Sequence, residues 1–316
     1  MPGLDRANPI FILGILPRSG TNFLFDLLSL HPECARGRVP INEDLFLHES
    51  DPLVAFIRAV RSRWDPIWGD VTDDLMDDFH AALGEGLISF LWVDRTRRLI
   101  TKSPSVHNVD RFFALFPKAR LVILVRDGRS VVQSCMATFG WHFERGARRW
   151  AEHAKEIRQF QTLARRRPDR CRIVRYEDLL DDLQSTLGPL LDFLQLDRSV
   201  YDFEAAVRLP VTGSSFYFGP GRENVHWEPV EKTAAFDSRA RWRDWPQGRH
   251  ERFEWIAGDL MRHFGYEELP EPVRGLRAVK HRVLDWRWAA RVGARGRLGP
   301  ATRPLRKRLG LVRAQP

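Results

Sequence analysis

Short runs of Val, Ile and Leu alternate with longer segments of mixed apolar and polar residues along the first half of the chain. The apolar runs predict buried strands at residues 10–16, 98–102, 121–125 and 171–176. The segments between them have helical spacing, at residues 23–30, 51–63, 73–83, 109–115 and 144–165. Buried strands that alternate with helices of this length are typical of a parallel sheet covered on both faces. The pattern therefore predicts an α/β fold with a central parallel sheet in three layers.

The pattern changes after Arg175. Short helices are expected there at residues 187–194, 201–207 and 250–264. Residues 210–229 contain Gly and Pro together with aromatic residues such as Phe216 and Trp227. An irregular stretch of that length within a compact domain is usually functional or disordered, and the aromatic content favours an ordered loop.

Basic charge is concentrated at the end of the chain. The net charge is +9, but residues 271–316 carry thirteen Lys and Arg against two acidic residues, which leaves residues 1–270 close to neutral. We therefore expect an α/β domain over residues 1–270, a basic, partly helical tail over residues 271–316, and no nucleic-acid partner. The tail has three interpretations: a solvated end, an amphipathic helix around residues 279–292 on an anionic membrane, or a basic arm for a polyanion. An ordered helix with a frayed end is favoured.

The composition is that of a globular protein, with 43% hydrophobic residues, enough for a substantial core. No apolar window reaches the length of a membrane helix, and the N-terminus lacks the order of a signal peptide. We expect a cytoplasmic location, with peripheral contact at the inner membrane surface as an option for the tail. Cys34, Cys135 and Cys171 show no paired spacing, so reduced thiols are expected rather than disulfides or a zinc site.

The first candidate site is PRSGTN at residues 17–22, where the first strand passes into a helix. In open parallel sheets, ligands bind beyond the carboxyl ends of the strands. A glycine lets the backbone approach a ligand, and the N–H groups that begin a helix attract an anion. Arg18 adds a permanently charged fork, and Ser19, Thr21 and Asn22 add donors. The segment predicts a phosphate or sulfate site.

Two other interpretations of residues 17–22 are open. Gly20 could form a simple turn, with Ser19 or Thr21 capping the helix. The segment also resembles the P-loop of nucleoside triphosphatases, but the spacing from Gly14 to Gly20 is one residue too long and no lysine follows Gly20. The cation precedes the glycine instead, which weakens the triphosphatase interpretation.

A second segment, LVILVRDGRSVVQS at residues 121–134, repeats the arrangement of strand, charge, glycine and helix. Arg126 ends the strand, and Ser134 follows eight residues later in the first turns of the helix. Both are expected to face the same crevice as residues 17–22. The simpler alternative is that Asp127 caps the helix while Arg126 and Arg129 are solvated. Two anion sites at strand ends of one sheet favour a ligand with two phosphate-like ends.

The two segments in this order resemble the cofactor motifs of the sulfotransferase family. Its donor is 3′-phosphoadenosine 5′-phosphosulfate (PAPS), and its nucleotide product is adenosine 3′,5′-bisphosphate (PAP). The resemblance spans roughly residues 10–267 and implies a P-loop-like fold. Further likenesses are LITKSP at residues 99–104, RYEDL at 175–179, and the W-x-x-W and HFGYE sequences within 242–267.

The resemblance implies a cofactor site in two parts. The first part, for the 5′-phosphosulfate, comprises Arg18, Ser19, Gly20, Thr21, Asn22 and Phe23. An arginine stands at Arg18 where cytosolic members usually have lysine. Arg126 and Ser134 would bind the 3′-phosphate, and Tyr176 of the RYEDL sequence is a further candidate for binding the cofactor. Arg222 and Lys232 are candidates for the 3′-phosphate or the acceptor, with Phe216 or Trp227 as a stacking surface, because the usual Arg-Lys-Gly loop is absent.

Sulfuryl transfer implies in-line geometry and cations where charge accumulates on the leaving nucleotide. Arg18 and Lys102 suit that task, and no metal is expected. Cytosolic members place a histidine just after the third-strand lysine, but Ser103 and Pro104 stand here. The acceptor is expected to be a carbohydrate, lipid or other small molecule with a hydroxyl group.

The general base is expected to be Glu43, with Asp44 and His107 as alternatives. Members similar to the tyrosylprotein and Golgi-type enzymes use a glutamate shortly after the first helix, although the tyrosylprotein spacing would fall on Arg38. Either acid could instead cap a helix near residues 45–48. A carboxylate near Arg18 should have a lowered pKa, so a base would need partial burial to offset this effect.

Two other functions are open. One is a P-loop-like nucleotide-dependent kinase, because LVILVRD can also be interpreted as a strand that ends in a magnesium-binding aspartate. The other is a non-catalytic protein that binds anions or a membrane surface through its basic tail.

Overall fold

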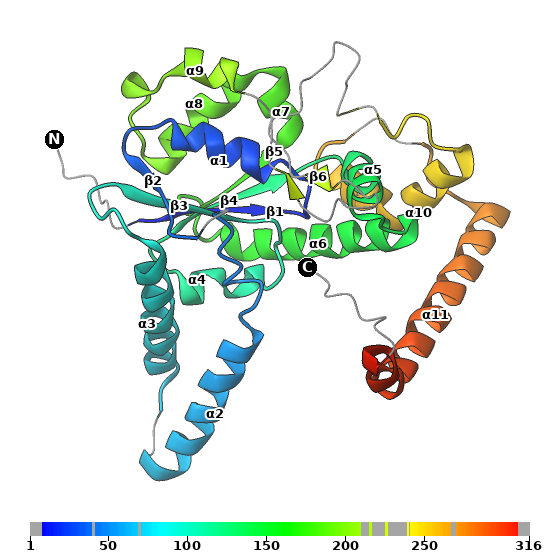
Figure 1. Cartoon of the computed structure of the whole chain (residues 1–316), viewed down its shortest axis with the longest axis horizontal. Helices are drawn as coiled ribbons and strands as arrows, with labels where there is room; N and C mark the ends of the chain where they lie inside the picture. Colours follow the sequence, from blue (N-terminus) through cyan, green and yellow to red (C-terminus); the bar gives the residue numbers. More distant parts are fainter. Residues whose placement is uncertain are drawn as a thin grey trace. The chain divides into compact units, whose positions relative to one another are not determined.

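The computed structural model describes residues 8–39, 42–68, 71–209, 215–216, 225–226, 239, 241–266 and 270–308 (Figure 1). The chain divides into two compact units. The first consists of Met1–Asp244 and Asp259–Glu267, and the second of Trp245–Gly258 and Glu268–Pro316. The division into residues 1–270 and 271–316 stays a prediction.

A five-stranded parallel sheet forms the centre of the first unit, in the order β2-β3-β1-β4-β5. The strands are β1 (Ile10–Gly14), β2 (Cys34–Arg36), β3 (Arg98–Ser103), β4 (Arg120–Val125) and β5 (Cys171–Arg175). On one side of β1, Ile12 lies opposite Lys102 of β3, and on the other side Gly14 lies opposite Leu124 of β4. The strand order thus reverses beside β1, which is where open parallel sheets bind ligands.

Helices cover both faces of this sheet, which confirms the predicted three-layer α/β fold (Figure 1). One face carries α1 (Thr21–Ser29), α7 (Tyr176–Asp181), α8 (Leu183–Leu194) and α9 (Phe203–Arg208). The other carries α4 (Phe112–Leu115), α5 (Gly128–Phe139) and α6 (Phe143–Ala164).

The remaining described elements of the first unit are α2 (Asp51–Trp68), α3 (Asp73–Leu91), the 3-10 turns η1 (Val109–Arg111) and η2 (Arg198–Val200), and the antiparallel pair β6 (Ser215–Phe216) and β7 (Val225–His226). α10 (Gln247–His263) contributes residues to both units, and α11 (Gly275–Arg308) lies in the second. Within the described residues, no helix has both the length and the apolar composition needed to cross a membrane.

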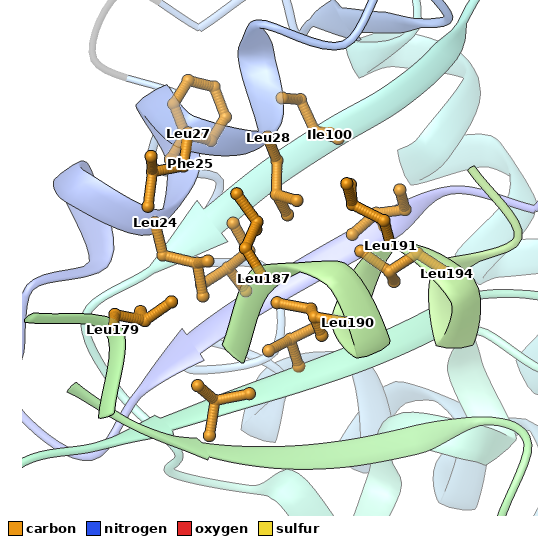
Figure 2. Packing of buried hydrophobic residues seen from close by; sticks show 14 of the residues in the cluster. Leu24, Phe25, Leu27, Leu28, Ile100, Leu179, Leu187, Leu190, Leu191 and Leu194 are labelled. Carbon is orange, nitrogen blue, oxygen red and sulfur yellow. The ribbon is translucent and has the colours of Figure 1, made fainter. Parts of the chain in front are cut away.

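Apolar side chains fill the space between the sheet and the helices on each side. Leu24 and Leu28 of α1 pack with Ile100 of β3 and the leucines of α8 (Figure 2). On the opposite face, Phe11 of β1 stacks on Phe116, with ring centroids 4.7 Å apart. All six residues of β4 are buried, as expected for a central strand with helices on both sides. This packing fixes the strand ends that carry the candidate site.

Several local expectations were wrong. β1 ends at Gly14, because the chain turns away after Ile15, whose N–H still donates to the Leu124 carbonyl. β2 and α7 were missed, since a three-residue strand and a six-residue helix are too short to show periodicity. Residues 46–49 form a turn rather than a helix. The three cysteines are free thiols, as expected. Most of the aromatic segment at residues 210–229 lies outside the described residues.

Candidate active site

The loop between β1 and α1 is closed by Ser19. This side chain is fully buried, and its hydroxyl donates to the Leu16 carbonyl at 2.5 Å and accepts from the Leu16 N–H at 3.1 Å. The Ser19 hydroxyl, predicted to orient a ligand, is therefore engaged in the turn itself. It gives the loop a fixed shape.

Gly20 occupies a position that no other residue fits. Its φ is 93°, in the left-handed region, and a Cβ there would lie 2.4 Å from the Tyr176 ring. Gly14 is restricted by space alone, because a Cβ there would lie 2.6 Å from the Thr21 methyl group. The two glycines thus let the loop pass between the sheet and Tyr176, and they bring its backbone close to the strand ends.

The N-terminus of α1 is open toward this loop. Gly20 has no side chain to cap the helix, and the first N–H groups of any helix lack partners within it. They carry the positive end of the helix dipole, which favours an anion. Thr21 and Phe23 are buried, and Asn22 is half-buried, so these residues contribute mainly through the backbone. The arrangement fits a phosphate or sulfate group.

Arg18 brings the two predicted segments together. Its Nε donates to the Ser134 hydroxyl of α5 at 3.0 Å. Arg126, at the end of β4, donates from Nη1 to the Arg18 carbonyl at 2.8 Å. Burial lowers the pKa of Arg18, and the neighbouring Arg126 charge lowers it further, yet a guanidinium remains charged at neutral pH. A half-buried cation, Arg18, next to a buried one, Arg126, at neighbouring strand ends is an arrangement that an anion would stabilise.

Tyr176 packs against both segments. The Arg126 guanidinium lies 4.5 Å from the centroid of its ring, while the same ring contacts the Gly20 position. Phe23 meets Tyr176 edge-on, with centroids 6.3 Å apart. Tyr176 therefore positions the loop after β1 relative to the cation after β4.

Glu177 and Tyr266 support the site but were not identified from the sequence as functional residues. Glu177 accepts from the Asp127 N–H at 2.9 Å and from the Tyr266 hydroxyl at 2.8 Å, and burial raises its pKa. The signal was present, because Glu177 belongs to the RYEDL sequence and Tyr266 to HFGYE. Glu177 bonds to the residue after Arg126, and Tyr266 bonds to Glu177, so both motifs support the loop after β4.

Asp127 and Arg129 form a buried ion pair at 2.6 Å, and Arg129 stacks on Trp242 at 3.6 Å from its ring centroid. Asp127 also accepts from the Arg129 N–H, so it caps α5 as the simpler alternative expected. The same alternative was wrong about solvation, since Arg126 and Arg129 are both buried. Trp242, from the W-x-x-W sequence, is the partner that makes this burial feasible.

A lysine–glutamate pair lies at the end of β3. Lys102 Nζ donates to Glu43 Oε1 at 2.8 Å, and only 3% of the Lys102 side chain is exposed against 18% for Glu43. Burial lowers the pKa of Lys102, while Glu43 counteracts that effect. Glu43 is held there by a β-bridge to Lys102, flanked by Asn42 and Leu45 at positive φ of 55° and 52°. Such strained residues concentrate at functional sites.

The other two candidate bases have different surroundings. Asp44 is buried, and its carboxylate accepts from the Thr101 hydroxyl at 2.7 Å and from the Phe46 N–H at 3.0 Å. Burial raises its pKa to about 6, against the lowering effect of those hydrogen bonds. His107 lies 3.9 Å from Glu156, and its ring faces His48 at 5.3 Å between centroids. Of the three candidates, Glu43 is the one whose carboxylate contacts the Lys102 ammonium, whereas Asp44 meets Lys102 through a backbone hydrogen bond at 3.2 Å.

His153 of α6 holds the start of the loop between β1 and α1 by a hydrogen bond to its backbone. Its Nδ1 lies 2.6 Å from the Ile15 carbonyl, and burial lowers its pKa to about 4. The ring is therefore neutral at physiological pH and donates from Nδ1. No sequence pattern singled out this residue, because its partner is a backbone carbonyl far along the chain.

Four sequence candidates cannot be placed in the site. Arg222, Lys232 and Trp227 lie outside the described residues, and for Phe216 the structure describes the backbone alone. Among the residues that the structure describes, no group of three or more His, Cys, Asp or Glu side chains is arranged to hold a metal ion.

The fold is α/β, and the candidate anion site lies at the reversal of strand order beside the central strand β1. The family model described as "Sulfotransferase family" matches residues 9–200, more than half of the chain. The chain therefore belongs to the sulfotransferase family, as the resemblance in its sequence indicated.

Several individual proteins are similar to this chain. The chain is 27% identical over 150 residues to protein-tyrosine sulfotransferase A of Caenorhabditis elegans, covering 43% of this chain and 35% of that protein. It is 26% identical over 212 residues to protein-tyrosine sulfotransferase 2 of Gallus gallus, covering 62% and 53%. It thus spans about a third to a half of these relatives. The sulfotransferase domain from the curacin biosynthetic pathway aligns with a TM-score of 0.48 and 18% identity, over 83% of this chain and 99% of that one.

Proposed function

We propose that this protein transfers a sulfuryl group from PAPS to a hydroxyl group of an acceptor. The observation that carries the proposal is the contact of Arg18 with Ser134, supported by the hydrogen bond from Arg126 to the Arg18 carbonyl. It joins the open N-terminus of α1 to a second cationic strand end. A donor nucleotide with two separate anionic groups matches this paired arrangement.

Each part of the pair has its own task in the proposal. The start of α1, with Arg18, binds the 5′-phosphosulfate, and Arg126 with Ser134 binds the 3′-phosphate. Tyr176 fixes the position of the two parts relative to each other through its contacts with Gly20 and Arg126. PAPS, when bound, supplies a sulfuryl group that is already activated by its bond to phosphate.

Glu43 is the proton acceptor in this proposal, and Lys102 stabilises the charge that develops on the leaving group. Glu43 accepts the proton of the acceptor hydroxyl at its carboxylate, which makes the oxygen a better nucleophile. A protonated Glu43 no longer neutralises the Lys102 ammonium 2.8 Å away. The Lys102 charge is then available to stabilise the phosphate that leaves, together with Arg18. The pair therefore couples removal of the proton to stabilisation of the leaving group.

Asp44 supports Glu43 rather than replacing it. Its two carboxylate oxygens are engaged by Thr101 and Phe46, next to the Glu43 bridge. These engaged oxygens favour Glu43 over Asp44 as the base, and the contact of the Glu43 carboxylate with Lys102 favours it over His107. We assign no metal to the reaction, and treatment with a chelator is expected to leave the rate unchanged.

The acceptor class is proposed as a small molecule, glycan or lipid that presents a hydroxyl group. The names of the relatives motivate inclusion of a tyrosine-containing peptide among the candidates. An assay with radiolabelled PAPS and a panel of phenols, sugars, hydroxylated lipids and a tyrosine peptide would test this proposal. Transfer to at least one acceptor, lost in Arg126→Ala, is expected.

The competing nucleotide-dependent kinase makes a different prediction. It would bind ATP in a magnesium-dependent manner, whereas the proposal requires binding of PAP without magnesium. Calorimetry with both nucleotides, with and without chelator, separates the two functions. Magnesium-dependent ATP binding together with no binding of PAP would overturn the sulfotransferase proposal.

A further inference from the structure

The N-terminal half of α11 packs through one face on α10, within the second unit. Arg252 donates to Asp285 at 2.6 Å, and Trp255 Nε1 donates to the other oxygen of that carboxylate at 2.8 Å. The Trp255 and His281 rings stack with centroids 5.6 Å apart, and His281 is buried. Asp285 and His281, four residues apart, therefore define the packed face of α11.

A continuous apolar stripe runs along the other side of α11. Its members, spaced by three and four residues, are exposed and comprise Leu276, Val279, Val283, Trp286 and Ala290. Leu276 is 89% exposed and Trp286 is 72% exposed. Spacing of three and four residues places them on one line of the helix. An apolar line of this length, uncovered in the described residues, marks a surface for interaction.

Basic side chains border the stripe. Lys280 and Arg287 lie on one side of it and Arg282 on the other, and all three are exposed. The single acidic residue between Arg274 and Gly293 is Asp285, whose carboxylate is held by Arg252 and Trp255. The exposed face is therefore apolar along its centre and uniformly positive along its edges.

This charge distribution distinguishes between three partners that the exposed face of α11 could bind: a second copy of the helix, a soluble polyanion and an anionic bilayer. A second copy of the same helix would place Lys280, Arg282 and Arg287 next to like charges at the flanking positions of a helix pair, which is unfavourable. A nucleic acid or other soluble polyanion would use the basic side chains but leave the apolar stripe in water. An anionic bilayer satisfies both, because the stripe enters the boundary between headgroups and acyl chains while the cations meet the lipid headgroups. Tryptophan is favoured at that boundary.

We propose that the stripe face of α11, defined by Leu276, Val279, Val283, Trp286 and Ala290 with flanking Lys280, Arg282 and Arg287, docks the protein on an anionic lipid surface. The inference does not depend on the sulfuryl transfer reaction. It gives the basic end of the chain a specific geometry, with α10 holding the helix through its packed face and the opposite face directed to the lipid.

The test is flotation of the full chain with vesicles of phosphatidylcholine alone and of phosphatidylcholine with phosphatidylserine. Binding is expected to the phosphatidylserine vesicles and to weaken with salt. Lys280→Gln/Arg282→Gln/Arg287→Gln should weaken it about a hundredfold, since each cation near an anionic surface contributes about fivefold. Leu276→Gln/Val283→Gln/Trp286→Gln should weaken it at least about tenfold.

Two matched controls test whether position on α11 matters. Arg58→Gln/Arg63→Gln/Arg166→Gln removes the same charge from exposed positions of the first unit. Val93→Gln/Leu163→Gln/Val207→Gln removes three exposed apolar side chains there. Both controls should float as the parent protein does, and circular dichroism should show the parent's helical content in all four variants.

Three results would overturn the proposal. The first is no flotation of the parent with phosphatidylserine vesicles. The second is equal weakening by an α11 variant and its control. The third is a vesicle-free dimer, seen by analytical ultracentrifugation, that the stripe variant dissociates, which would assign the stripe to a second copy of the chain.

Discussion

The Nε of Arg18 lies 3.0 Å from the hydroxyl of Ser134, although 116 residues separate them in the chain. Arg18 follows β1 and Ser134 lies in α5, the helix after β4, and these two strands are neighbours in the sheet. The parallel sheet is therefore what converts two distant sequence segments into one candidate site.

Replacing Ser134 should weaken PAP binding. Ser134→Ala removes a hydroxyl that the Arg18 guanidinium uses, and a hydrogen bond to a charged group contributes about 1.5–3 kcal/mol. We expect affinity for PAP to fall roughly tenfold to a hundredfold by isothermal titration calorimetry. Ser130→Ala is the matched control, because its hydroxyl on the same helix donates to the Arg239 carbonyl. Equal losses in both variants would argue against a specific role for Ser134.

Replacing Gly20 should destabilise the protein far more than replacing another glycine with a left-handed backbone conformation. Gly20→Ala places a methyl 2.4 Å from the Tyr176 ring, at a φ of 93°. Gly140→Ala has a φ of 63° but nothing within 4 Å of the new methyl. Gly140→Ala should lower the free energy of unfolding by about 1 kcal/mol, and Gly20→Ala by about 3 kcal/mol or more, with loss of PAP binding.

Denaturant titration of the two glycine variants measures this difference. If Gly20→Ala is no less stable than Gly140→Ala, the close packing of Tyr176 on the loop is not a constraint in solution. A stable Gly20→Ala protein that still binds PAP would remove the basis for assigning the loop to the anion site.

The sequence predicted the sheet and the proximity of residues 17–22 to residues 126–134, because strands and strand-end loops leave local patterns. Buried strands such as β4 are continuous apolar runs, and residues 17–22 and 126–134 carry charge and glycine at strand ends. The contact of Arg18 with Ser134 itself required the strand order, which places β1 beside β4. Local spacing cannot supply that order.

The features that were missed depend on contacts between distant segments. Glu177 and Tyr266 meet only in the folded chain, and His153 is defined by the backbone carbonyl of Ile15. The Ser19 hydroxyl was expected to face a ligand, but it bonds instead to the Leu16 carbonyl within the turn of residues 16–19. A side chain's polar chemistry is visible in the sequence, whereas the partner that satisfies it is not.

Glu43→Gln should strongly reduce turnover while leaving nucleotide binding intact. Glutamine cannot accept the acceptor's proton, and loss of a general base lowers kcat by roughly a hundredfold to ten-thousandfold. Binding of PAP should change little, since Glu43 contacts Lys102 rather than residues 17–22 or 126–134. His107→Gln provides the comparison, because His107 lies beside His48 and Glu156. A larger loss of kcat in His107→Gln than in Glu43→Gln would transfer the role of base to the histidine.

Asp44 should make stability depend on pH, and Asp44→Asn should remove that dependence. Burial raises the pKa of Asp44 from its ordinary value of 3.8 to about 6, so the folded state holds this proton more tightly than the unfolded state does. Ionisation therefore costs stability: the cost is absent below the unfolded pKa, grows as pH rises through the folded pKa, and is constant above it.

Asparagine stays neutral and can keep both contacts, accepting from Phe46 and donating to Thr101. The free energy of unfolding of Asp44→Asn minus that of the parent should thus increase by about 2 kcal/mol between about pH 4 and about pH 7. Urea titrations of both proteins across this range measure the difference, in which the contributions of other groups cancel. Parallel pH profiles would mean that the Asp44 carboxyl ionises as readily in the folded protein as in the unfolded chain.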